Sequence, residues 1–151
     1  MKSLLNFISL RGRAKTRPIT LIGALPARKS SVVALVLAKL LSGQKVNAID
    51  IALEAQTSRV KDLVSTLRKQ HGWGSICSEK IAVGTYDGRV QWVCQYWLPI
   101  DVLDQSRTHL TLEWVNAVFE SRRIMKLNSR YAKRRAQACN SRQRLTVEGG
   151  K

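Results

Sequence analysis

The sequence is short of acidic residues. Only 10 aspartates and glutamates stand against 26 lysines and arginines among 151 residues, which gives a formal net charge of +16. The hydrophobic fraction of 44% is ordinary for a globular protein and argues against wholesale disorder. A chain of this length with an ordinary hydrophobic content but few acidic residues points to a polyanionic partner, most often nucleic acid.

Cysteine and histidine are also scarce. The chain holds three cysteines (Cys77, Cys94, Cys139) and two histidines (His71, His109), with no CxxC and no HxxxH pair. Structural zinc sites use such local ligand pairs, so we expect neither a metal site nor a cofactor. An odd number of cysteines suggests a reducing compartment, and we predict a cytoplasmic protein.

Long apolar runs and catalytic motifs are missing as well. No window of about 18 apolar residues occurs, so we expect no transmembrane span and no membrane partner. No P-loop, carboxylate pair or Ser/His/Asp arrangement is recognisable, which favours a binding protein over an enzyme. The acid-free segment Met1–Leu10 predicts a short amphipathic arm or helix, with a mitochondrial presequence as the alternative.

The basic residues are concentrated at the two ends. Residues 1–29 hold seven bases and residues 122–144 hold nine, without a single acid in either segment, whereas residues 30–121 hold nine of each sign. Like-charge blocks usually act as interaction tails, although they also aid solubility. We therefore predict a basic N-terminal arm over 1–29 and a basic C-terminal arm over 122–151. The predicted phosphate contacts of the C-terminal arm are Arg122, Arg123, Lys126, Arg130, Lys133, Arg134 and Arg135.

Three helices are expected in the first half of the neutral body. The first spans 32–41, with Ser30 or Ser31 as N-cap and Gly43 past its end. The second spans 48–55, with Asn47 as N-cap. We expect its inward residues to be Ile49, Ala52 and Leu53.

The third helix is expected from Ser58 to Gln70, after a short polar turn. Its apolar stripe has the spacing i, i+3, i+4 and i+7 and consists of Val60, Leu63, Val64 and Leu67. Two short helices joined by such a turn form a helix-turn-helix unit.

A β-hairpin follows, because the apolar period changes from 3.6 to 2. The Asp87-Gly88 pair predicts a two-residue turn that pairs 86 with 89, 83 with 92 and 81 with 94. In that register one core face holds Ile81, Val83, Val90, Trp92, Cys94, Tyr96 and Leu98, and the other face, with Val93 and Trp97, is mostly wet. The register also predicts that Cys77 and Cys94 are not cross-strand partners.

Residues 30–99 resemble the winged helix-turn-helix proteins, in particular the small ones common in bacteriophages and other mobile elements. The resemblance is carried by VNAIDIALEAQTSRVKDLVSTLRKQHGWGSICSEKIAVGTYDGRVQWVCQYWL, and it implies an α+β fold of three helices and a hairpin wing. It further implies that the third helix enters the DNA major groove and that the wing touches the backbone or the minor groove. The sequence departs from the family in carrying Glu54-Ala55-Gln56 where a glycine often lies in the turn.

The same residues give candidate contacts to DNA. The outward third-helix residues expected to approach base edges are Ser58, Arg59, Asp62 and Ser65, and those expected at phosphates are Lys61, Arg68 and Lys69. Asp62 either orients Arg59 through an i, i+3 pair or accepts from cytosine. Tyr86 and Arg89 flank the wing tip and are expected near the sugar-phosphate backbone.

Beyond Pro99 the sequence predicts a short helix from Asp101 and an amphipathic helix from about Leu110, within an extension over 100–121. The apolar stripe of the longer helix comprises Leu112, Trp114, Val115, Val118, Phe119 and Met125. It predicts either a homodimer interface or a cover for the sheet face that carries Trp97.

Together these features predict a winged-helix protein that binds double-stranded DNA and regulates transcription or replication. A sequence-independent packaging or ribonucleoprotein subunit, bound to DNA or RNA mainly through the arms, is one alternative. A winged-helix module that acts on a host protein is the other.

Overall fold

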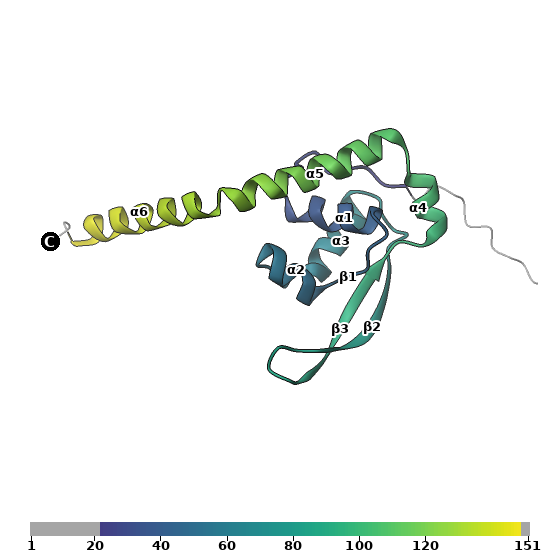
Figure 1. Cartoon of the computed structure of the whole chain (residues 1–151), viewed down its shortest axis with the longest axis horizontal. Coiled ribbons are helices and arrows are strands. Elements are labelled where there is room, and N and C mark those ends of the chain that lie inside the picture. Colours follow the sequence, from purple (N-terminus) through teal and green to yellow (C-terminus); the bar gives the residue numbers. More distant parts are fainter. Residues whose placement is uncertain (1–21, 149–151) are drawn as a thin grey trace, which may run out of the picture.

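The computed structural model describes residues 22–148, which form an α+β structure (Figure 1). The helices are α1 Val32–Leu41, α2 Ala48–Ala55, α3 Val60–Gln70, α4 Ile100–Ser106, α5 His109–Leu127 and α6 Ser129–Glu148. The strands are β1 Val46–Asn47, β2 Cys77–Gly84 and β3 Val90–Trp97, and they form one antiparallel sheet in the order β1-β3-β2. The predicted α+β class is confirmed, and the arrangement is compatible with a winged-helix-like one. Most of the predicted N-terminal arm, including Met1–Leu10, lies outside the described residues.

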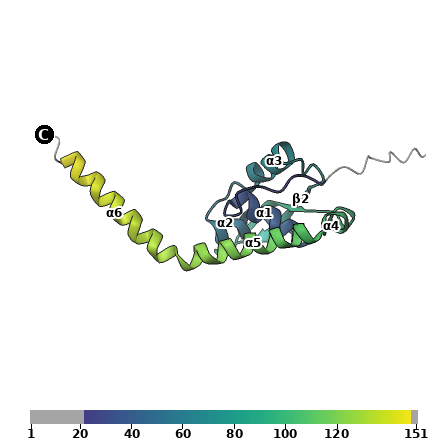
Figure 2. The ribbon, with the colours of Figure 1, turned by 90° about the horizontal axis from the view of Figure 1, so that it is seen from above.

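Helix α1 is the centre of the core. The Ser31 hydroxyl accepts a hydrogen bond from the Ala34 amide at 3.2 Å, as an N-cap residue should, and Gly43 takes a positive φ just past the helix. Residues Ala34 to Ala38 are buried without interruption because α3 and α5 pack on opposite sides of α1 (Figure 2). The first predicted helix is confirmed in both extent and capping.

Helix α2 has the predicted bounds but not the predicted inner face. The Asn47 side chain accepts from the amides of Ile49 and Asp50, which confirms the cap. Ile51 is the residue that is fully buried, whereas Leu53 is 70% exposed, so the expectation that Leu53 faces inward was wrong. A helix of eight residues holds too few apolar positions for the period alone to choose between neighbouring faces.

The hairpin is shifted by one residue from the predicted register. Ile81 pairs with Val93 and Val83 pairs with Gln91, so the prediction that 81 pairs with 94 was wrong. The cause is a three-residue loop. The Thr85 amide donates to the Arg89 carbonyl at 2.8 Å, and Gly88 has a φ of +82° while Asp87 does not enter that region. A two-residue type I′ turn needs positive φ at both central residues, whereas a type I turn followed by a left-handed glycine makes the longer loop.

The shift moves side chains to the other face of the hairpin. Ile81, Val83 and Val93 now share one face, and Val93 is buried with only 8% exposure. Val90 and Trp92, predicted in the core, lie on the opposite face and are exposed to 72% and 69%. The cysteines nevertheless remain apart, as predicted: Cys77 pairs with Trp97, Cys94 pairs with Lys80, and all three thiols are free.

The sequence analysis did not predict two features of the fold, strand β1 and the packing of the segment before α1. Strand β1 pairs with the base of β3 through Val46 and Tyr96. The segment before α1 also packs on the domain: the Ala24 amide donates to the His71 carbonyl at 2.7 Å, and the buried Trp73 indole donates to the Ala24 carbonyl at 2.9 Å. A Cβ on Gly23 would lie 2.2 Å from the His71 carbonyl oxygen, so only glycine allows this close approach.

The C-terminal helices begin near the predicted residues. Helix α5 buries Trp114, Val115 and Val118 against the core and packs on α1, while the half-buried Trp97 has the Lys45 ammonium 5.3 Å from its ring. Helix α6 follows after Asn128 and projects away from the domain, with every side chain from 129 to 145 exposed (Figure 1).

Candidate nucleic-acid interface

The third helix separates an inner apolar stripe from an outer polar face. Val60, Val64 and Leu67 are at most 1% exposed, and Leu63 packs beside them, which confirms the predicted stripe. The outer face consists of Lys61, Asp62 and Lys69, which are exposed, and Ser65, which is half-buried. The packing on α1 therefore fixes the helix and directs these side chains to solvent. The helix begins at Val60 with Arg59 as N-cap, so the predicted start at Ser58 was wrong, and the exposed Ser58 and Arg59 lie just before the helix.

The turn between α2 and α3 uses a residue that is not glycine. Gln56 has φ 54° and ψ 37°, the left-handed conformation, and its amide still donates to the Ala52 carbonyl at 3.0 Å. The position where a glycine was missing in the sequence thus adopts the backbone that glycine favours. The tight turn between the two helices is therefore formed, but Gln56 is strained because its side chain disfavours the left-handed conformation.

No side chain of the N-cap residue caps the amino-terminal end of α3. Arg59 is the N-cap residue and its side chain makes no cap bond; its amide donates to the Thr57 hydroxyl at 3.3 Å. Arg59 and Asp62 form no ion pair among the described residues, so the predicted i, i+3 pair is absent. Asp62 lies in the first turn, where a carboxylate stabilises the positive end of the helix dipole.

Arg68 differs from the other basic residues of α3. Its guanidinium donates to the Ile76 carbonyl at 2.6 Å and lies 6.0 Å from the centre of the Tyr96 ring. Burial raises the pKa of the Tyr96 phenol. Arg68 therefore ties α3 to the residue before β2 and to β3, and its guanidinium is engaged within the domain.

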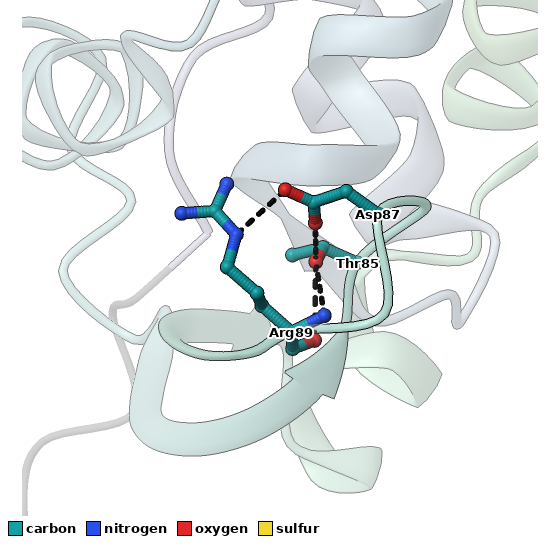
Figure 3. Close-up of polar contacts among 3 residues, drawn as sticks. All are labelled: Thr85, Asp87 and Arg89. Carbon is teal, nitrogen blue, oxygen red and sulfur yellow. Dashed lines mark hydrogen bonds and ion pairs between the residues drawn. The ribbon is translucent and has the colours of Figure 1, made fainter.

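The wing tip is held by a small polar network (Figure 3). The Thr85 hydroxyl bonds to one carboxylate oxygen of Asp87, and the Arg89 guanidinium donates to the other at 2.6 Å. The Thr85 hydrogen bond, more than the Arg89 contact, holds the pKa of Asp87 below its ordinary value. Tyr86 is fully exposed, and Arg89 is exposed but has its charge offset by Asp87.

The predicted basic residues of the C-terminal arm lie along the end of α5 and along α6. Arg123 donates to both carboxylate oxygens of Glu120, at 2.9 and 2.6 Å, which lowers the pKa of Glu120 and raises that of Arg123. The Arg122 guanidinium lies 4.0 Å from the Met125 sulfur and has no ion pair in the described chain. The other side chains of this set without an ion pair there are Lys126, Arg130, Lys133, Arg134 and Arg135. Because the side chains from 129 to 145 are all exposed and several of them are cations without an ion pair, this part of α6 is an electrostatic surface rather than part of the core.

The three groups of candidate residues lie on different elements of the structure. Figure 1 shows the wing and α6 projecting in different directions, and Figure 2 shows α6 inclined toward the level of α3. The candidate contacts therefore lie on three elements: the outer face of α3, the tip of the hairpin β2-β3, and the exposed basic helix α6, which is called the rod below.

The sequence missed Lys80 and Trp92 as candidates, because the predicted register placed Lys80 on a wet face away from Trp92. The signal that would have located them is the segment Thr85 to Arg89, since threonine, aspartate and then a left-handed glycine suit a three-residue loop.

Within residues 22–148 no group of histidine, cysteine and acidic side chains is arranged to hold a metal ion. No helix of that range is long and apolar enough to cross a membrane. Comparison with protein-family models, with curated proteins and with solved structures gave no match to this chain.

Proposed function

We propose that this protein binds double-stranded DNA through a winged-helix arrangement and regulates transcription or replication. The order of the elements and the sheet order β1-β3-β2, with the hairpin β2-β3 as the wing, support the arrangement. The sequence resemblance to small bacteriophage and mobile-element proteins supports a regulator that acts in the bacterial cytoplasm.

The observation that carries the proposal is the outer face of α3. An α-helix with its side chains is about 10–12 Å wide and fits the major groove of B-DNA, which is about 12 Å wide. Arg59, at the open end of α3, is the best candidate for a bidentate contact to guanine. No described part of the chain covers Arg59, Lys61 or Asp62, so a duplex can approach them.

The basic residues outside α3 supply affinity without sequence information. Lys61 and Lys69 flank the groove face, and the unpaired cations of α6 extend the field of positive charge. Each neutralised phosphate contributes a slope of about −0.9 in log K against log salt. We expect the rod to position the protein and α3 to select the site.

A selection from random duplexes at near-physiological salt tests the proposal with the full chain. We expect enrichment of a defined site and a loss of preference of about 1–3 kcal/mol for Arg59→Ala on that site. Arg107→Ala, an exposed arginine of the α4–α5 junction, is the matched control and should leave the preference unchanged.

The selection also separates the two alternatives. Equal binding to all duplexes and to RNA, lost when the α6 cations are neutralised, assigns the chain to packaging or ribonucleoprotein assembly. If the chain binds no nucleic acid, the remaining alternative is a winged-helix module that acts on a host protein. Enrichment of a palindrome identifies a homodimer on DNA, because half-site symmetry follows protein symmetry.

A further inference from the structure

On one face of the hairpin, the side chains of β3 change from buried at the base to exposed near the tip, while those of β2 are exposed throughout. This face, called here the Trp92 face, comprises Ser78, Lys80, Ala82 and Gly84 of β2 with Val90, Trp92, Cys94 and Tyr96 of β3. At the base Tyr96 is only 4% exposed, whereas Trp92 is 69% exposed nearer the tip. The reason is visible in Figure 1, where the hairpin runs past the helices that cover its base.

The strand opposite Trp92 does not cover the indole. Ala82 is the direct partner of Trp92, and Gly84 is the partner of Val90 and thus a diagonal neighbour of Trp92. A Cβ added to Gly84 would meet no atom within 4 Å, so the space beside the indole is open. A large ring on a rigid strand with small neighbours presents a flat surface for another ring to stack on.

The charge of this face indicates the kind of partner that it would bind. None of its eight residues is acidic, and Lys80 lies on it as the other diagonal neighbour of Trp92. Glu79 belongs to the opposite face. At its base the face adjoins α3, because the Arg68 guanidinium lies over Tyr96. An aromatic surface beside a cation and next to a helix that binds duplex suits a nucleobase with its phosphate.

We propose that Trp92 is a stacking site for an unpaired nucleobase next to the duplex that α3 binds, with Lys80 at the neighbouring phosphate. The proposal rests on the proposed function, because it takes the duplex on α3 as given. It narrows the target to DNA with a single-stranded or opened segment. Such segments arise where replication or transcription starts, which is consistent with a regulator of either process.

The test measures fluorescence anisotropy of the full chain with three probes: a duplex, the same duplex with a short thymidine overhang, and that overhang made of abasic nucleotides. The abasic overhang keeps the phosphates and lacks the bases. We expect the thymidine overhang to bind about 5- to 150-fold more tightly than the abasic one, the range of one base–aromatic stack. Trp92→Ala should remove that difference, and Trp92→Phe should retain part of it.

Three further variants keep the test decisive. Gly84→Leu leaves the tryptophan in place but adds a side chain beside it, so it should also reduce the base-dependent gain. Gln91→Ala, on the same strand and the opposite face, should preserve the gain. Lys80→Ala should weaken both overhang probes equally.

Several results would overturn the proposal. These are equal affinity of the wild-type chain for the two overhangs, a gain that survives in Trp92→Ala, and absence of binding to all probes. Failure of the proposed function has a different signature. In that case the plain duplex shows no site preference and no response to Arg59→Ala, while the difference between thymidine and abasic overhangs is still measured.

Discussion

Helices α3 and α6 both carry several basic residues, yet they are held in opposite ways. Helix α3 buries Val60, Val64 and Leu67 on α1, whereas α6 has no buried side chain from 129 to 145. A helix fixed by a buried stripe presents its outer side chains in one geometry, which base recognition requires. A helix fixed only by its connection to α5 contributes charge in many geometries, which suffices for phosphates.

The largest difference between the two helices should be in stability. Leu67→Ala removes a fully buried side chain, and we expect the free energy of unfolding to fall by about 2–5 kcal/mol. Leu145→Ala on α6 should change it by less than about 0.5 kcal/mol. Urea unfolding followed by tryptophan fluorescence measures both, and equal losses would contradict the contrast between the helices.

Neutralising the rod should change the salt dependence of DNA binding. We expect the combined change of Arg130, Lys133 and Arg134 to glutamine to make the slope of log K against log salt shallower by about 2.7. The preference for a selected site over random duplex should stay the same. Replacing Arg130 and Arg134 by lysine keeps the charge and is the control; a change in slope there would argue against a purely electrostatic contact.

A single phosphate contact on α3 should have a smaller effect of the same kind. Lys61→Ala is expected to weaken all duplexes alike and to reduce the slope by about 0.9. Lys61→Arg should restore both quantities. Loss of preference among duplexes, measured by competition titration, would instead assign Lys61 to base contact.

A substitution in the turn before α3 is expected to stabilise the protein. Gln56 has a positive φ, so Gln56→Gly should raise the free energy of unfolding by about 0.5–1 kcal/mol, because glycine adopts this backbone without a side-chain clash. Gln56→Ala retains a Cβ and should bring no such gain. Urea unfolding of the two variants side by side measures the difference.

The smallest expected effect is the titration of Asp87 at the wing tip. Its pKa is lowered from 3.8, mainly by the Thr85 hydroxyl, so the tip network is complete above the unfolded pKa. The network weakens as the pH falls through the folded pKa. Carboxyl NMR should show a midpoint below 3.8 that rises in Thr85→Val and rises less in Arg89→Gln. An unchanged midpoint in Thr85→Val would show that the hydroxyl bond does not form.

Much of the fold followed from local chemistry. Ser31 and Asn47 cap their helices because their side-chain oxygens reach amides two or three residues ahead, which depends on the neighbouring sequence alone. The stripe of α3 followed from its 3.6-residue period over eleven residues. The basic ends and the neutral middle were set by composition, and with them the expectation of a polyanionic partner.

Other features depended on parts of the chain that meet only in space. Whether Trp92 or Val93 is buried was decided by a one-residue difference in loop length, because side chains alternate between the faces of a strand. The contacts of Arg68 with Ile76 and Tyr96, and the exposure of Leu53, likewise depend on how α2, α3 and the hairpin pack together. The sequence by itself determined the helices, and its charge predicts a polyanionic partner. The tertiary structure decided which side chains that partner can touch, since exposure is a property of packing between segments.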